Sequence, residues 1–100
     1  MLDYDDPSAG AHQRARVDFI QNELEFVQGC VKRSAIELEH QNVARAKELL
    51  DAAKRSHDTA LDQLSKLPPK LDVRNLMAFA GFLAEDMRDL QAEIEMLLRQ

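Results

Sequence analysis

Cysteine, glycine, proline and aromatic residues are all scarce in this chain, and each scarcity narrows what the protein can be. One Cys in 100 residues cannot close an internal disulfide, which is typical of a reducing compartment, so we expect a cytoplasmic protein. Only three Gly, three Pro and no Trp, beside 45% apolar residues, indicate an ordered, helix-rich domain rather than a disordered chain.

Long apolar runs and an excess of basic charge are also missing. No run approaches the roughly 18 residues that span a bilayer, and no charged-then-apolar leader opens the chain, so we expect neither a span nor a secretory signal. The net charge is −5, and basic residues form only short pairs, Lys32-Arg33 and Lys54-Arg55. A nucleic-acid-binding protein would show a basic patch, so we expect no nucleic acid and no membrane among the partners.

The stretch from Asn42 to Leu67 has the most regular pattern in the chain. Its stripe residues recur at alternating steps of three and four, which predicts one face of a helix. The stripe consists of Val43, Ala46, Leu50, Ala53, His57, Ala60, Leu64 and Leu67. Every second position is an alanine, and small residues at heptad spacing let a neighbouring helix approach closely.

Two further stripes with the same spacing lie on either side of this one in the sequence. One consists of Val17, Ile20, Leu24, Val27, Val31, Ala35 and Leu38, and the other of Leu76, Ala80, Leu83, Met87, Leu90, Ile94 and Leu97. They predict an all-α fold, an up-down-up antiparallel three-helix bundle with helices over about 11–39, 43–67 and 72–99. We expect residues 1–10 to form an acidic flexible arm and residues 11–100 to form the bundle domain.

The connections between these helices are predicted from local signals. The stripe jumps five residues, from Leu38 to Val43, which would rotate the apolar face of a continuous helix. We therefore predict a tight turn at 39–42, with Asn42 as the N-cap of the second helix and Asp72 as that of the third. The alternative is one helix of more than roughly fifty residues, which an isolated small domain rarely uses. Pro68-Pro69 ends the second helix.

A second apolar row on the first helix is the best candidate for a functional surface. Phe19, Phe26 and Cys30 lie beside the main stripe, and they face either the third helix or a partner, which the sequence leaves open. Phe82 and Met96 fall outside the stripe of the third helix and join them as candidate partner-surface residues.

His57 is the most informative polar residue because it lies in the middle of the alanine stripe. Folding the helices back at residues 41 and 69 places it level with Glu23 on one side and Gly81 on the other, where a glycine could make room for the imidazole. One interpretation is a core histidine with a side-chain or water partner. The other is a pH-sensitive latch between His57 and Glu23. Burial disfavours the imidazolium and a paired carboxylate favours it, and we expect burial to dominate.

No pattern in the sequence predicts catalysis or a cofactor. There is no glycine-rich phosphate loop, and no nucleophile stands beside an obvious base, so we expect a protein that is not an enzyme and has no cofactor. Glu37-x-x-His40 has the spacing of ferritin-like di-iron helices, but those sites need a second such motif and further inward-facing glutamates. We therefore expect no metal site.

Residues 36–67 resemble the helical hairpin of tetratricopeptide-type repeats. The polar Gln41-Asn42 turn, followed by Ala44, Ala46-Lys47 and Leu49-Leu50, lies as in their GN-x-x-A pattern. With a third helix after a proline-rich turn, the layout is also similar to three-helix MIT-type domains. The chain lacks the usual glycine before Asn42 and the aromatic positions of the repeat. The resemblance implies a module that binds short helical or extended peptides between its helices, and it transfers no binding residue.

Together these patterns favour a non-enzymatic helical protein–protein interaction module. We expect a protein or peptide partner. The module would either self-associate into a homodimer or serve as an adaptor. The alternative is a pH- or ligand-responsive regulatory protein that uses the buried His57.

Overall fold

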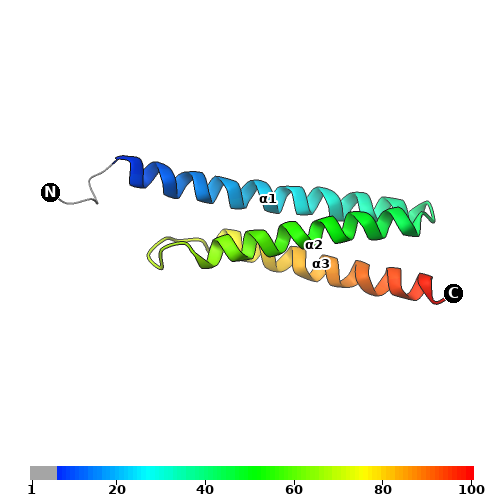
Figure 1. Ribbon diagram of the computed structural model, residues 1–100. Helices are drawn as coiled ribbons and strands as arrows, with labels where there is room; N and C mark the ends of the chain where they lie inside the picture. Colours follow the sequence, from blue (N-terminus) through cyan, green and yellow to red (C-terminus); the bar gives the residue numbers. More distant parts are fainter. Residues whose placement is uncertain (1–6) are drawn as a thin grey trace.

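Three long helices account for nearly all of the structure. The computed structural model describes residues 7–100, with side chains from His12 onward. Its helices are α1 (Pro7–Glu39), α2 (Val43–Ser65) and α3 (Arg74–Leu98). Figure 1 shows α2 running back along α1, and α3 running back along α2. Each helix packs against the other two, which confirms the all-α, up-down-up antiparallel three-helix bundle.

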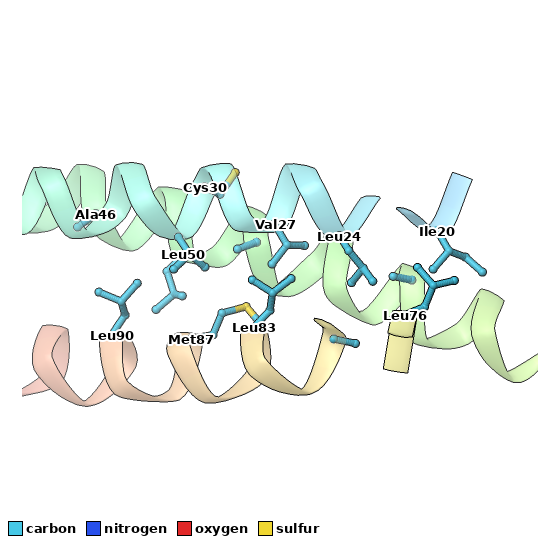
Figure 2. Packing of buried hydrophobic residues seen from close by; sticks show 14 of the residues in the cluster. Ile20, Leu24, Val27, Cys30, Ala46, Leu50, Leu76, Leu83, Met87 and Leu90 are labelled. Atoms are coloured by element: carbon cyan, nitrogen blue, oxygen red, sulfur yellow. The ribbon is translucent and has the colours of Figure 1, made fainter. Parts of the chain in front are cut away.

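The predicted stripes form the core. Their buried members are Ile20, Leu24, Val27, Val31, Leu38, Ala46, Leu50, Ala53, His57, Ala60, Leu67, Leu76, Ala80, Leu83, Met87, Leu90 and Ile94. Figure 2 shows Leu24 and Val27 of α1 pointing toward α3, from which Leu83 points back. Hydrophobic burial therefore joins all three helices in one cluster.

The predicted turn between α1 and α2 is confirmed, and it is a Schellman motif. The Asn42 N–H donates to the Glu37 carbonyl at 2.8 Å, and the Gln41 N–H donates to the Leu38 carbonyl at 2.9 Å. Gln41 has a φ of 62°, in the left-handed region that glycine usually occupies at this position. Asn42 is the N-cap residue of α2 as predicted, but its side chain makes no capping hydrogen bond, and its Nδ2 donates to the Glu37 Oε2 at 2.9 Å.

The other helix ends differ from prediction by a few residues. α1 begins at Pro7 rather than 11, since proline is favoured in the first turn of a helix, so residues 7–10 are not an arm. The rest of the predicted arm, residues 1–6, lies outside the described residues. α2 ends at Ser65 rather than 67, because Leu67 precedes Pro68 and is disfavoured in the helical region.

α3 begins at Arg74 rather than 72, and Asp72 acts in front of it. The Asp72 Oδ1 accepts a hydrogen bond from the Arg74 backbone N–H at 3.2 Å, and the two side chains also pair. Hydrogen bonding to the Arg74 side chain holds the pKa of the Asp72 carboxyl below its ordinary value. The predicted N-cap position belongs instead to Val73, which has no side-chain acceptor.

Close packing of α1 and α2 follows from the alanine stripe. Ala46, Ala53 and Ala60 are all completely buried. The buried Ser34 hydroxyl of α1 donates a hydrogen bond to the backbone carbonyl of Ala46 on α2 at 2.8 Å. A serine side chain is short, so it reaches the backbone of the next helix only where the residue there has little side chain. The two helices therefore meet across small residues, as the stripe predicts.

This packing predicts a specific sensitivity to added volume. Ala53→Leu adds three carbons to a buried position of α2, and overpacking of this kind costs about 1–3 kcal/mol. Ala44→Leu is the matched control, because Ala44 is exposed on the same helix, and we expect a change within about 0.5 kcal/mol. Urea unfolding of both variants measures the difference, and equal midpoints for Ala53→Leu and the wild type would show that α1 and α2 do not pack closely there.

Candidate functional site

An apolar groove runs between α2 and α3. It has a volume of about 440 Å³ and is lined by His57, Leu61, Leu64, Ser65, Val73, Met77, Ala80, Gly81 and Ala84. Leu61 is 44% exposed and Met77 is 60% exposed, so each helix contributes a large apolar side chain that water reaches. Only His57 and Ser65 bring polar side chains to the groove, which makes it a surface suited to apolar groups.

His57 connects this groove to the core. It is 6% exposed, and its Nε2 lies 2.8 Å from the backbone carbonyl oxygen of Ala80 on α3. A carbonyl only accepts, so Nε2 is the donor, and Nδ1 of the neutral ring is left as an acceptor. The described contacts include no hydrogen bond to Nδ1, and the residue as a whole is part of the groove lining.

His57 is a core histidine whose partner is a backbone carbonyl, and the alternative latch between His57 and Glu23 is not formed among the described contacts. The two side chains form no hydrogen bond or ion pair among the described contacts, and the imidazole bonds to α3 instead. The residue of α3 that lies opposite His57 agrees with the prediction to within one position, because Ala80 directly precedes the expected Gly81. The physical reason is the direction of the side chain: His57 lies on the side of α2 that faces α3, whereas Glu23 is on α1.

Gly81 leaves space in the groove rather than making room for the imidazole. A Cβ atom added to Gly81 would meet no heavy atom within 4 Å, so the ring of His57 does not occupy that space. This corrects the expected reason for the glycine. Ala80, Gly81 and Ala84 give α3 small residues on this side, and the groove is open above them.

The first half of α3 has a second sequence feature, which lies outside its apolar stripe. Residues 75–84 read NLMAFAGFLA and contain no charge, although 31% of the chain is charged. A surface helix normally places charged residues opposite its apolar stripe. Here Met77 is 60% exposed and Phe82 is 67% exposed, about 140° apart around the helix axis. This half of α3 is therefore uncharged around its whole circumference although water reaches much of it.

The second apolar row of α1 consists of two exposed rings and one buried thiol. Phe19 is 44% exposed and Phe26 is 52% exposed, so neither ring is enclosed by α3. Cys30 is only 6% exposed and belongs to the core, which corrects its expected place in a partner surface. Cys30 is small, and the two rings lie about 20–40° further around α1 from the core than it does. Figure 2 shows the Cys30 side chain on the side of α1 turned away from α3.

The environment of Cys30 makes it a poor nucleophile. Burial raises the pKa of its thiol, although the positive charges of Arg33 and Arg45 act in the opposite direction. Phe26, Cys30 and both arginines line a second hollow, between α1 and α2. Its rim is charged, and Arg45 pairs there with Glu48 at 3.1 Å.

Phe82 and Met96 do not join the aromatic row of α1. Met96 is 59% exposed, and it lies about 21 Å along α3 from Phe82, at 1.5 Å per residue. Neither of them lines the groove or the second hollow. Phe82 and Met96 are therefore described as separate exposed positions on α3.

The described residues offer no metal centre and no membrane span. No group of three or more His, Cys, Asp or Glu side chains in this part of the chain could hold a metal ion. Among the helices of residues 7–100, none combines the length and hydropathy needed to cross a membrane.

Comparison with protein-family models, curated proteins and solved structures finds no match to this chain. The resemblance of residues 36–67 to tetratricopeptide-type hairpins is therefore not accompanied by a family match, and the groove is interpreted from its own geometry.

The space at Gly81 predicts that this glycine is not needed for folding. Gly81→Ala should raise the free energy of unfolding by up to about 1 kcal/mol, because alanine is the better helix former and its Cβ meets nothing. Gly29→Ala on α1 is the matched control with equally open surroundings and the same expected gain. Thermal melts of both variants measure it, and a loss of stability only in Gly81→Ala would mean that the groove is closed in solution.

Proposed function

We propose that this protein is a non-enzymatic interaction module whose groove between α2 and α3 receives an amphipathic helix of a partner protein. The observation that carries the proposal is the uncharged half of α3, which exposes Met77 to water in the lining of the apolar groove. Exposed apolar surface of this kind is typical of protein interaction sites.

The groove has the dimensions of a short helix. From Val73 to Ala84 its lining covers eleven residue steps of α3, which at 1.5 Å each gives about 16 Å. Anchors at positions i, i+4 and i+7 of a bound helix span about 10 Å, so three anchors fit within it. A helix seated there would pack against α2 and α3 as a fourth helix of the bundle.

The polar content of the groove argues for binding rather than for catalysis. Active sites bring together several titratable side chains in contact with the substrate. The groove offers one imidazole and one hydroxyl, and Ser65 already donates its hydroxyl hydrogen bond to the Asp62 carbonyl at 2.6 Å. A helix-binding role requires no more than this apolar lining.

Blocking the groove tests the proposal. We expect a library of displayed helical peptides, selected against the wild-type protein, to yield ligands that bind Gly81→Leu at least about tenfold more weakly, since leucine fills the groove. Gly29→Leu is the matched control: it makes the same change on exposed α1, in open surroundings, and should bind like the wild type. Failure to select any helical ligand, or ligands that bind both variants equally, would contradict the proposal.

Self-association through Phe19 and Phe26 is a second candidate function. The two rings are seven residues apart, on nearly the same side of α1, and are 44% and 52% exposed. A second copy could cover this row in a symmetric dimer.

Replacing both rings with glutamate tests this second candidate. If the wild type sediments as a dimer at high micromolar concentration, Phe19→Glu with Phe26→Glu should sediment as a folded monomer, because charges would be buried without partners. Phe82→Glu is the control at an exposed ring elsewhere on the bundle. A wild type that remains monomeric throughout rules out self-association by this row.

A further inference from the structure

We propose that the second hollow, between α1 and α2, binds a phosphate monoester with a flat aromatic body, and that its arginines hold the phosphate. This hollow shares no lining residue with the groove between α2 and α3. The site is therefore separate from the proposed helix-binding groove, and either one can exist without the other.

The bottom of the hollow is apolar. Cys30 and Leu49 belong to its lining and are each only 6% exposed, and Ala52 lies beside them. Phe26 adds a ring that is half exposed to water. The hollow has a volume of about 510 Å³, within the range of about 300–1,000 Å³ that is typical of small-molecule sites. It therefore has both the surface and the room for an apolar body.

Three arginines line the same hollow. Arg33 comes from α1, and Arg45 and Arg55 come from α2. Two carboxylates, those of Glu48 and Asp51, also belong to the lining. Whether the hollow attracts an anion therefore depends on how these charges are paired.

Both carboxylates are paired with cations of their own helix. Glu48 pairs with Arg45 at 3.1 Å, and Asp51 pairs with Lys47 at 3.3 Å. Among the described residues, Arg33 and Arg55 belong to no ion pair. Exposed ion pairs contribute little, so Arg45 is also available to a doubly charged anion.

The basic character of the hollow is local. On α1, Glu23 and Glu37 lie about one turn beyond the two ends of the lining, and Glu37 accepts a hydrogen bond from the Asn42 Nδ2 at 2.9 Å. The chain as a whole carries −5, so it adds no attraction at long range. An anion is therefore held here by direct contact with the arginines.

The hydrogen bond between Ser34 and Ala46 shows how the arginines lie along the bundle. It places these two residues at the same height on antiparallel helices. Counted from there, Arg33 lies opposite position 47, which is two residues, or about 3 Å along the axis, from Arg45. One arginine from each helix thus stands at this end of the hollow.

The charges of these two arginines also reach the bottom of the hollow. Burial raises the pKa of the Cys30 thiol, and the positive charges of Arg33 and Arg45 act in the opposite direction. Both guanidinium groups are therefore near Cys30, although they come from different helices.

The other end of the hollow is aromatic. By the same count, Phe26 lies opposite position 54, one residue from Arg55. A ring placed here packs against Phe26, and the guanidinium of Arg55 is at the right height to contact its face. This end lies about 12 Å along the axis from Arg33 and Arg45.

The two ends together select the ligand. Two guanidinium groups offer more N–H donors than the two oxygens of a carboxylate engage, whereas a phosphate monoester has three terminal oxygens and nearly two negative charges. An aromatic body attached to that phosphate extends over the apolar bottom of the hollow toward Phe26. A two-ring body covers most of this distance.

Naphthyl phosphate is the probe that tests the proposal. Naphthol lacks its charge, inorganic phosphate lacks its body, and naphthoate has a carboxylate in place of the phosphate. Binding of each compound to the isotope-labelled full chain is measured by titration followed by NMR, which gives both the affinity and the residues affected.

We expect naphthyl phosphate to bind at least about tenfold more tightly than naphthol or inorganic phosphate, and more weakly at high salt. Naphthoate should bind more weakly than naphthyl phosphate because it carries less charge. The shifted signals should come from residues 26–33 of α1 and 45–55 of α2.

Replacing the two arginines at the cationic end tests their role. Arg33→Gln with Arg45→Gln should weaken binding of naphthyl phosphate at least about tenfold and leave the binding of naphthol unchanged. Arg16→Gln with Arg88→Gln is the matched control, because it removes the same two charges at exposed positions outside the lining. It should bind naphthyl phosphate like the wild type.

Each contrary result overturns a stated part of the proposal. Equal binding of naphthyl phosphate and naphthol, or an equal loss in the two double variants, overturns the role of the arginines. Naphthoate that binds as tightly as naphthyl phosphate overturns the choice of phosphate. If the variant with Arg33→Gln and Arg45→Gln does not fold, the four compounds on the wild type still decide.

The location of the shifts separates this site from the proposed function. Shifts at Met77 and Gly81, with none in residues 26–33, would place the probe in the groove between α2 and α3 and overturn the site at the hollow. The helix-binding proposal would be unaffected by that result. No shift with naphthyl phosphate at millimolar concentration also overturns the site.

Discussion

Hydrogen bonds from side chains of one helix to backbone carbonyls of the next are the constraint on which this bundle depends. The Ser34 hydroxyl on α1 donates to the Ala46 carbonyl on α2, and the His57 imidazole on α2 donates to the Ala80 carbonyl on α3. Both acceptors belong to alanines, because a larger side chain would hold the helices too far apart for the donor to reach the backbone. Each bond contributes about 1 kcal/mol, and it also sets how the two helices lie along one another.

The same use of small residues has opposite results on the two sides of α2. Toward α1, the backbone of Ala46 meets the side chain of Ser34, and these two helices form the most extensive contact of the bundle. Toward α3, the small residues continue past the contact as Gly81 and Ala84, with no side chain to cover them. Close approach therefore produces a sealed interface on one side and an open apolar groove on the other.

His57 lies where these two features meet, which gives the groove its chemical character. One ring nitrogen bonds to the Ala80 carbonyl and fixes α3 against α2, and the same residue lines the groove. The uncharged first half of α3 supplies most of the remaining apolar lining on that side. We interpret the bundle as a scaffold for the groove between α2 and α3, in which α1 packs against α2 and stabilises it.

The sequence by itself determined the number of helices, their antiparallel order and most of the core. Burial on one face of a helix requires apolar residues at steps of three and four, and this spacing is visible in the sequence. The sequence also contains the uncharged run of residues 75–84, most of whose exposed residues lie outside the apolar stripe. Helix ends at Pro7 and Ser65 depended on local turn chemistry and were missed by a few residues. Only the tertiary structure decided that His57 bonds to Ala80 and not to Glu23, that Cys30 is buried, and that Leu61 and Met77 flank one groove. Each depends on the rotation of one helix against another, which is set by the packing of all three together and not by the spacing within any one of them.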